Sequence, residues 1–270
     1  MATIDRARGK AWLSDDELRL LPLLASDPDH DQLNSPDGER LRDVLREQGA
    51  LVGTRLRYPL RGFAELIAAP KLRVVIETFI AESEVTHSVW ANEGDAVLGI
   101  SDAPGVVELS RVEPVLIPWA ITYVVGLGPR PKPELGAPVT LPSSALDAAF
   151  EAAVGGGRER AAAVLAEQTD LVAPAQHVVA DLLVDRRISW RASSIWTDGS
   201  GETQTRTVTV VDGGRRGLWL SETDTLRVQD PPVRLEPTRP SNVWRRIVAL
   251  VPPVPRWPER EPEQAEAESG

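Results

Sequence analysis

Residues 63–127 read FAELIAAPKLRVVIETFIAESEVTHSVWANEGDAVLGISDAPGVVELSRVEPVLIPWAITYVVGL, and the expected fold follows from this segment. A short helix ends before Pro70, because the residue that precedes a proline disfavours the helical conformation. Four segments with strand character follow, separated by turns at 92–95 and 103–105. An apolar helix begins after Pro114 and ends the stretch. The pattern predicts one α-β-β-β-β-α unit.

A second copy of this pattern runs from residue 179 to residue 254. The openings align as Ala64-Glu65-Leu66-Ile67 with Ala180-Asp181-Leu182-Leu183, and the closings as Pro114-x-x-Ile117-x-x-x-Ile121 with Pro240-x-x-Val243-x-x-x-Ile247. Weak self-similarity of this kind is what an internal duplication leaves behind. A chance similarity between two hairpin-rich segments is the alternative. We therefore expect an α+β fold with a pseudo-two-fold duplicated unit.

The rest of the chain divides around these two units. We expect an N-terminal half over 1–128, a proline-rich connector over 129–142 and a C-terminal half over 143–257, followed by a disordered acidic tail over 258–270. Residues 1–13 show no pattern and are interpreted as a frayed lead. Ser14 and Glu17 form a capping box that predicts the start of the first helix. Strands are also expected at 205–211, 217–220 and 225–228.

The composition excludes several classes of function. The net charge is −10, and a nucleic-acid partner or an anionic membrane surface would favour a basic patch instead. Cysteine is absent, so the chain has no disulfide, thiolate metal site or cysteine nucleophile, which fits a reducing compartment. No apolar run approaches the length of a membrane span, and the first residues lack the apolar core of a signal peptide. We expect a cytoplasmic protein.

No catalytic constellation is found in the sequence. His30, His87 and His177 lack the serine or carboxylate partners of a recognisable motif, and His30 with its neighbouring aspartates is a weak metal candidate because adjacent side chains diverge. The glycines at 155–157 lack the strand and the Gly-Lys-Ser/Thr ending of a phosphate loop. We expect no catalytic residue, no cofactor and no metal.

The chain resembles the EspG family, the chaperones of type VII secretion in actinobacteria. The matching features are spread over residues 13–253: Leu13-Ser14-x-x-Glu17-Leu18, Leu66-x-x-x-Pro70-x-Leu72-x-Val74, Gly126-Leu127-Gly128-Pro129 and Trp244-x-x-Ile247-x-x-Leu250-Val251-Pro252. The resemblance implies a central antiparallel sheet flanked by helical bundles. It also implies a non-enzymatic chaperone that binds the apolar helical tip of a PE/PPE- or WXG100-like secretion substrate and keeps it soluble.

The resemblance further implies that cargo lies between the sheet and the C-terminal helical bundle. Strand alternation then suggests Trp196, Thr207, Thr209 and Trp219 as partner-binding candidates. Thr207 and Thr209 lie on the polar face of their strand, although an exposed, solvated strand face explains the same pattern. Trp219 either shares that face or fills the core.

The sequence is also compatible with two other functions. One is an immunity or inhibitor protein, which is also acidic and non-catalytic. The other is a small-molecule-binding or hydrolytic α+β enzyme, which would need a deep pocket with converging polar groups.

Overall fold

The structure, a computed structural model, describes residues 2–80, 83–103, 105–134, 137–223 and 230–252. Within these ranges, eleven strands form one sheet in the order β1-β2-β8-β7-β6-β5-β10-β11-β12-β13-β9, and β3 and β4 form a separate hairpin. All paired neighbours are antiparallel. The strands are β1 Thr3–Asp5, β2 Lys10–Ser14, β3 Leu51–Val52, β4 Arg55–Leu56, β5 Leu72–Ile80, β6 Ser83–Ala91, β7 Ala96–Ala103, β8 Val106–Val112, β9 Val139–Pro142, β10 Ile188–Thr197, β11 Thr203–Asp212, β12 Leu218–Thr223 and β13 Pro232–Thr238.

Seven α-helices accompany the sheet in the described residues. They are α1 Asp15–Ser26, α2 Pro36–Glu47, α3 Leu60–Ala68, α4 Ile117–Val125, α5 Ser143–Gln168, α6 Ala173–Val184 and α7 Pro240–Leu250, and a 3₁₀ turn at Pro114–Leu116 leads into α4. Across the parts of the chain that are described, none of these helices has the length and apolarity that a membrane crossing requires. The expected α+β class is confirmed.

The centre of the sheet is the pair β5–β10, which joins segments more than a hundred residues apart. Leu72 lies opposite Trp196 at one end of this pair, and Phe79 lies opposite Ser189 at the other. Outward from the centre, β5, β6, β7 and β8 follow one another on one side, and β10, β11, β12 and β13 on the other. Both runs therefore have the same strand order.

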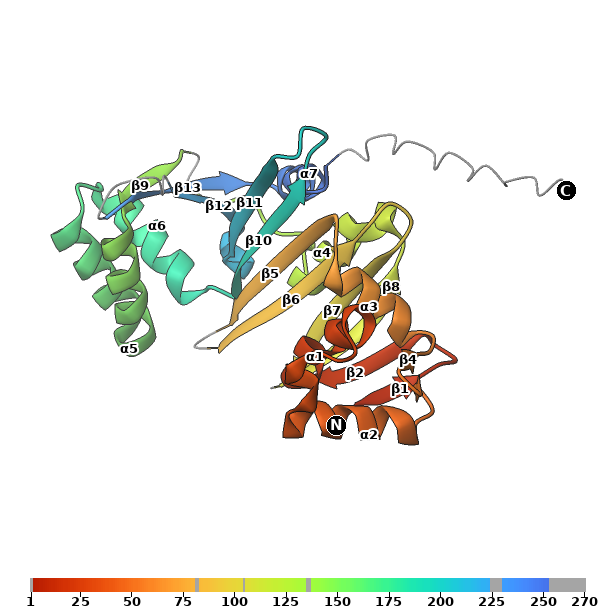
Figure 1. The fold of residues 1–270 in the computed structure, drawn as a ribbon. Helices are drawn as coiled ribbons and strands as arrows, with labels where there is room; N and C mark the ends of the chain where they lie inside the picture. Colours follow the sequence, from red (N-terminus) through yellow and green to blue (C-terminus); the bar gives the residue numbers. More distant parts are fainter. Residues whose placement is uncertain (1, 81–82, 104, 135–136, 224–229, 253–270) are drawn as a thin grey trace, which may run out of the picture.

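One face of the sheet carries a helical layer at each end (Figure 1). At one end α1, α2 and α3 pack on β2, β6, β7 and β8, and their shared core includes Leu13, Trp90 and Leu109. At the other end α5 and α6 pack on β9, β12 and β13 over Trp219 and Leu235. Figure 1 shows these layers well separated, with the long central strands between them.

The opposite face of the sheet is covered at its centre by α4 and α7. The core beneath them draws on strands from both halves of the chain, including Val74, Ile76, Trp190 and Val210. The two helices are neighbours, and the rings of Trp119 and Trp244 have their centroids 4.5 Å apart.

The structure confirms several local predictions. The Ser14 hydroxyl accepts a hydrogen bond from the backbone N–H of Glu17, and the Glu17 carboxylate accepts one from the N–H of Ser14, so the capping box begins α1 as predicted. Strands cover 205–211 within β11 and 218–220 within β12. The strand expected at 225–228 and the tail expected at 258–270 lie outside the described residues.

One expectation was wrong. Residues 1–13 are not a frayed lead, because β1 and β2 extend the sheet beside β8, and the indole N–H of Trp12 donates to the carboxylate of Glu108 at 3.1 Å. A further strand was not expected: the last residues of the proline-rich segment over 129–142 form β9 and pair with β13. β1, β2 and β9 have only 3, 5 and 4 residues, which is too short for a clear strand pattern in the sequence. β2 and β9 form strands because they pair with the edge of a strand that is distant in the sequence, and β1 extends the sheet from β2.

A candidate protein-binding surface

The centre of the face that carries both helical layers has no helix over it in the described part of the chain. Residues opposite one another in a sheet share a face, so the register can be followed from strand to strand. Trp90 on β6, under α1–α3, lies opposite Arg73 on β5. Arg73 lies opposite Ile195 on β10, and Ile195 in turn lies opposite Thr205 on β11. Along β11 every second residue then stays on this face as far as Val211, which lies opposite Trp219 under α5–α6. A strip of open sheet therefore separates the two layers.

We call this region the central strip: Val75, Glu77, Arg191, Ser193, Ile195, Thr207 and Thr209. All of these residues except Ile195 line a hollow of about 620 Å³, with β12 residues and Arg246 at its rim. Thr207 is exposed and Thr209 half-buried. Ile195 is 41% exposed, so the strip combines polar groups with apolar contact area.

Hydrogen bonds hold the polar side chains of the strip in place. The guanidinium of Arg191 donates to both carboxylate oxygens of Glu77, from Nε at 2.6 Å and Nη2 at 2.8 Å. These bonds hold the pKa of Glu77 below its ordinary value, although partial burial opposes the shift. The hydroxyls of Ser193 and Thr207 lie 3.0 Å apart. The strip is thus pre-ordered, which lowers the entropic cost of binding a partner.

The structure brings together only two of the four predicted residues. Thr207 and Thr209 lie in the central strip, on the face that the alternation predicted. Trp219 shares their face but has no exposed surface, because α5 and α6 cover it, and its indole N–H donates to the carbonyl of Arg216. Trp219 therefore fills the core, the second of the two positions considered for it from the sequence. Trp196 lies on the opposite face, where it packs beside the core under α4 and α7.

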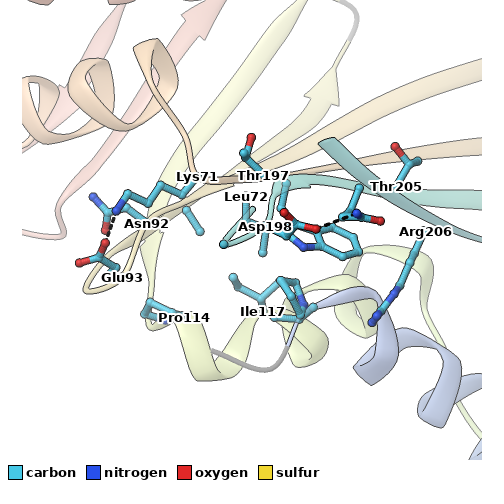
Figure 2. A pocket seen from close by; sticks show the side chains of 16 residues that line it. Lys71, Leu72, Asn92, Glu93, Pro114, Ile117, Thr197, Asp198, Thr205 and Arg206 are labelled. Carbon is cyan, nitrogen blue, oxygen red and sulfur yellow. Dashed lines mark hydrogen bonds and ion pairs between the residues drawn. The ribbon is translucent and has the colours of Figure 1, made fainter. Parts of the chain in front are cut away.

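Trp196 lines a separate groove at the ends of the central strands. Figure 2 shows this groove from close by. This groove, which we call the strand-end groove, has a volume of about 380 Å³ and is lined by the ends of β5, β6, β10 and β11, the start of α4 and Val251–Pro252. The guanidinium of Arg206 lies over the Trp196 ring, with Cζ 5.0 Å from the centroid. Hydrogen bonds from Ser200 and Gln204 lower the pKa of Asp198, at the rim, to about 2.

Neither hollow has the arrangement of a catalytic site. His87 is buried on the α4–α7 face, where its Nδ1 accepts a hydrogen bond from the N–H of Ser101, and His177 is exposed on α6. Among the residues that the structure describes, no three His, Asp or Glu side chains are grouped so that they could hold a metal ion.

Sequence reasoning did not select Glu77 and Arg191 as site residues. Each is an ordinary charged residue at an alternating strand position, and 114 residues separate them along the chain. Only the register between β5 and β10 places them opposite one another, and no local signal carries that register.

Comparisons with known proteins find similarity to one family and to a solved structure of a member of it. The model of the EspG family matches residues 32–243. No curated protein matches the sequence. Among solved structures, the chain is similar to the Mycobacterium tuberculosis type VII secretion system chaperone EspG5, solved in complex with the PE25–PPE41 dimer. The two share 14% sequence identity and a TM-score of 0.57, over 92% of this chain and 97% of that one. At this identity the match supports the fold alone.

Proposed function

Because this chain belongs to the EspG family, we propose that it is a cytoplasmic chaperone that binds the helical tip of a PE/PPE-like type VII secretion substrate and keeps it soluble for export. The family consists of secretion chaperones rather than enzymes. A secreted helical pair that exposes an apolar tip before export is prone to aggregate, so covering that tip requires binding and no covalent chemistry.

The observation that carries the proposal is the uncovered central strip between two helical layers. A helical tip that enters between the layers meets a sheet surface of Val75, Ile195 and the threonine methyl groups, with α5 and α6 rising on one side. The hydroxyls and the Glu77–Arg191 pair supply hydrogen-bonding groups for turn residues of the tip. A mixed surface of this kind is typical of interfaces that form and later separate, as release of cargo requires.

Within this proposal, Thr207 and Thr209 contact the cargo directly. Trp219 has no exposed atoms, so its role is to support the C-terminal edge of the strip from within the core. The partner named for EspG5, the PE25–PPE41 dimer, indicates the class of cargo to test first.

We also propose that the fold arose by duplication, with halves over 1–128 and 143–257 joined at 129–142. The identical strand order on the two sides of β5–β10 supports this proposal. So does the burial, in one shared core, of the aligned residues Ile117 and Ile121 on α4 and Val243 and Ile247 on α7. Superposing residues 64–127 on 180–252 tests it: matching paths of the strands and closing helices are expected, and divergent paths would contradict a duplication.

Co-purification of the chain with a PE/PPE-like pair tests the chaperone role. The double variant Thr207→Glu with Thr209→Glu is expected to change the melting temperature little, because Thr207 is exposed and Thr209 is only half-buried, and substitutions outside the core cost little. Capture of the pair is expected to fall sharply, because carboxylates would be buried against an apolar tip. Thr140→Glu, on the exposed edge strand β9, is the matched control and should capture the pair as the unmodified chain does. Undiminished capture by a stable double variant would move the site away from the central strip.

A further inference from the structure

The outward side of α4 carries apolar side chains that no other element in the described part of the chain covers. Val115, Trp119 and Tyr123 stand at every fourth position along the 3₁₀ turn and α4, and their exposed fractions are 75%, 61% and 76%. We call these three residues the apolar stripe. The helix itself, Ile117–Val125, contains no charged residue. Large apolar side chains gathered on a solvent-facing helix mark a surface that binds another molecule.

An aromatic hollow adjoins the apolar stripe on the side of α7. Its volume is about 580 Å³, and Trp119 and Thr122 of α4 line it together with Trp244 of α7. The rings of Trp119 and Trp244 lie against each other, with their centroids 4.5 Å apart. Because each ring limits the rotation of the other, little side-chain entropy is lost when a partner covers them. The pair therefore suits the role of an aromatic anchor.

A basic hollow continues from the aromatic hollow past the start of α7. The linings of the two hollows share Ser241 and, as far as the structure describes them, include no Asp or Glu. The basic hollow has a volume of about 320 Å³ and is also lined by Lys132, Arg239 and Arg245. All three cations are exposed, and none of them pairs with a carboxylate of the described residues. In a chain of net charge −10, this surface is thus locally positive and complementary to an acidic partner.

We propose that the apolar stripe and the basic hollow together bind an amphipathic helix of a partner protein. The apolar side of that helix packs on the stripe, and acidic side chains along its edge meet Lys132, Arg239 and Arg245. Side chains at every fourth position form the ridge along which one helix packs against another. The helix α4 covers the face of the sheet opposite the central strip, so the partner binds beside cargo and not in its place. This last consequence rests on the function proposed above.

Two other occupants fit the charges less well. A second copy in a two-fold contact would bring the same three cations of each copy to one interface, where the described lining offers no carboxylate to meet them. An anionic membrane is extended and would also face the negative remainder of a chain of net charge −10. A single helix contacts only this surface, and charges beyond a Debye length, about 8 Å at physiological salt, are screened.

Fluorescence anisotropy of a labelled probe peptide tests the proposal on the full-length chain. The probe is an amphipathic helical peptide of Leu and Glu, and the matched probe has Lys in place of every Glu. The Leu/Glu probe is expected to bind at least about tenfold more tightly at physiological salt. The net charge of −10 by itself favours the Leu/Lys probe. A preference for the Leu/Lys probe, or no binding of the Leu/Glu probe, would therefore overturn the proposal.

Variants of the surface locate the bound probe. Trp119→Ala and, separately, Lys132→Glu with Arg245→Glu should each weaken binding of the Leu/Glu probe about tenfold or more. These side chains are exposed, so the variants keep the fold. Arg55→Glu with Arg57→Glu, at exposed positions in and next to β4, changes the net charge by the same amount. This matched control should bind the probe as the unmodified chain does, and undiminished binding by Trp119→Ala would refute the proposal.

The double variant Thr207→Glu with Thr209→Glu separates this surface from the central strip. It should bind the Leu/Glu probe unchanged, because its substitutions lie on the other face of the sheet. If it loses the probe while Trp119→Ala retains it, the peptide occupies the central strip. That result would overturn the proposal for α4 and leave the proposed chaperone function standing.

Two further measurements exclude the other occupants. Sedimentation velocity should show a monomer at all concentrations. A dimer that Trp119→Ala abolishes would mean that a second copy covers the apolar stripe. Flotation with vesicles of phosphatidylcholine and phosphatidylglycerol, mixed three to one, should leave the chain in solution. Vesicle binding that Trp119→Ala abolishes would mean that a membrane covers the stripe, and either result would overturn the proposal.

Discussion

Glu77 and Arg191 face each other across β5 and β10 and join the two halves of the chain by a two-pronged ion pair, with Nε–Oε2 at 2.6 Å and Nη2–Oε1 at 2.8 Å. A carboxylate whose pKa is lowered in the folded state contributes stability above its unfolded pKa, and this contribution is lost as the pH falls through the folded pKa. Glu77→Gln should therefore lower the melting temperature at neutral pH.

The difference in melting temperature between Glu77→Gln and the unmodified chain should shrink as the pH falls below 4.5, the ordinary pKa of glutamate, and vanish below the folded pKa. Thermal unfolding measured from pH 7 to pH 2.5 checks this. Glu47→Gln, at the exposed end of α2, is the control and should show little difference at any pH. A difference for Glu77→Gln that is constant over the whole range would show that the ion pair is not its source.

Trp219 is predicted to be a stability residue. Its side chain has 0% exposure beneath α5 and α6, so Trp219→Ala leaves a large cavity and is expected to cost about 3–5 kcal/mol of unfolding free energy. Trp119→Ala, at 61% exposure and in contact with Trp244, is expected to cost only about 0.5–1.5 kcal/mol. Denaturant unfolding of both variants checks the contrast, and equal losses would contradict the burial of Trp219.

Asp212 ties the start of the connector to the end of β11. Its carboxylate is almost fully buried and accepts hydrogen bonds from Arg130 Nε at 2.8 Å and Nη2 at 2.7 Å, and from the N–H of Gly214 at 2.9 Å. Asp212→Ala leaves the largely buried guanidinium of Arg130 without its carboxylate partner. The substitution is expected to lower the free energy of unfolding by about 3–5 kcal/mol.

The same substitution at an exposed pair is the control for Asp212. Asp43 pairs with Arg46 at 3.0 Å on the surface of α2, and Asp43→Ala should cost at most about 1 kcal/mol. Denaturant midpoints of the two variants provide the comparison. A loss at Asp212 no larger than that at Asp43 would contradict a structural role for this buried pair.

His87 is predicted to make stability depend on pH in mildly acidic solution. Burial lowers its pKa below the ordinary value of 6.5, and its Nδ1 accepts the N–H of Ser101 at 3.2 Å, which requires the neutral ring. As the pH falls, the unfolded chain takes up a proton at His87 before the folded chain does. The contribution of the neutral His87 ring to folding stability is therefore present above pH 6.5 and is lost as the pH falls below it.

Replacing His87 with Gln should therefore flatten the pH dependence of the melting temperature just below pH 6.5, and His177→Gln, on the exposed surface of α6, should not. NMR titration of the ring protons gives the folded pKa directly. A folded pKa of 6.5 or higher for His87 would refute the prediction.

Local patterns in the sequence predicted much of the secondary structure. The capping box at Ser14 and Glu17, the prolines at 70 and 114 and the alternation along 205–211 each act within a few residues, so their effects do not depend on the rest of the fold. The same alternation placed Thr207, Thr209 and Trp219 on one face. The alternation does not show that α5 and α6 cover Trp219 and leave the two threonines accessible. Those helices come from residues 143–184, outside the strands that alternate.

Local patterns in the sequence are therefore sufficient to predict the α+β class, the strand faces and the family resemblance. Three further features depend on how the chain folds as a whole: the pairing of β5 with β10, the addition of β1, β2 and β9 to the sheet, and the position of the open central strip. Each depends on contacts between residues far apart in the chain. Backbone hydrogen bonds between strands are the same for every side chain, so a local stretch of sequence carries no record of which distant strand it will meet.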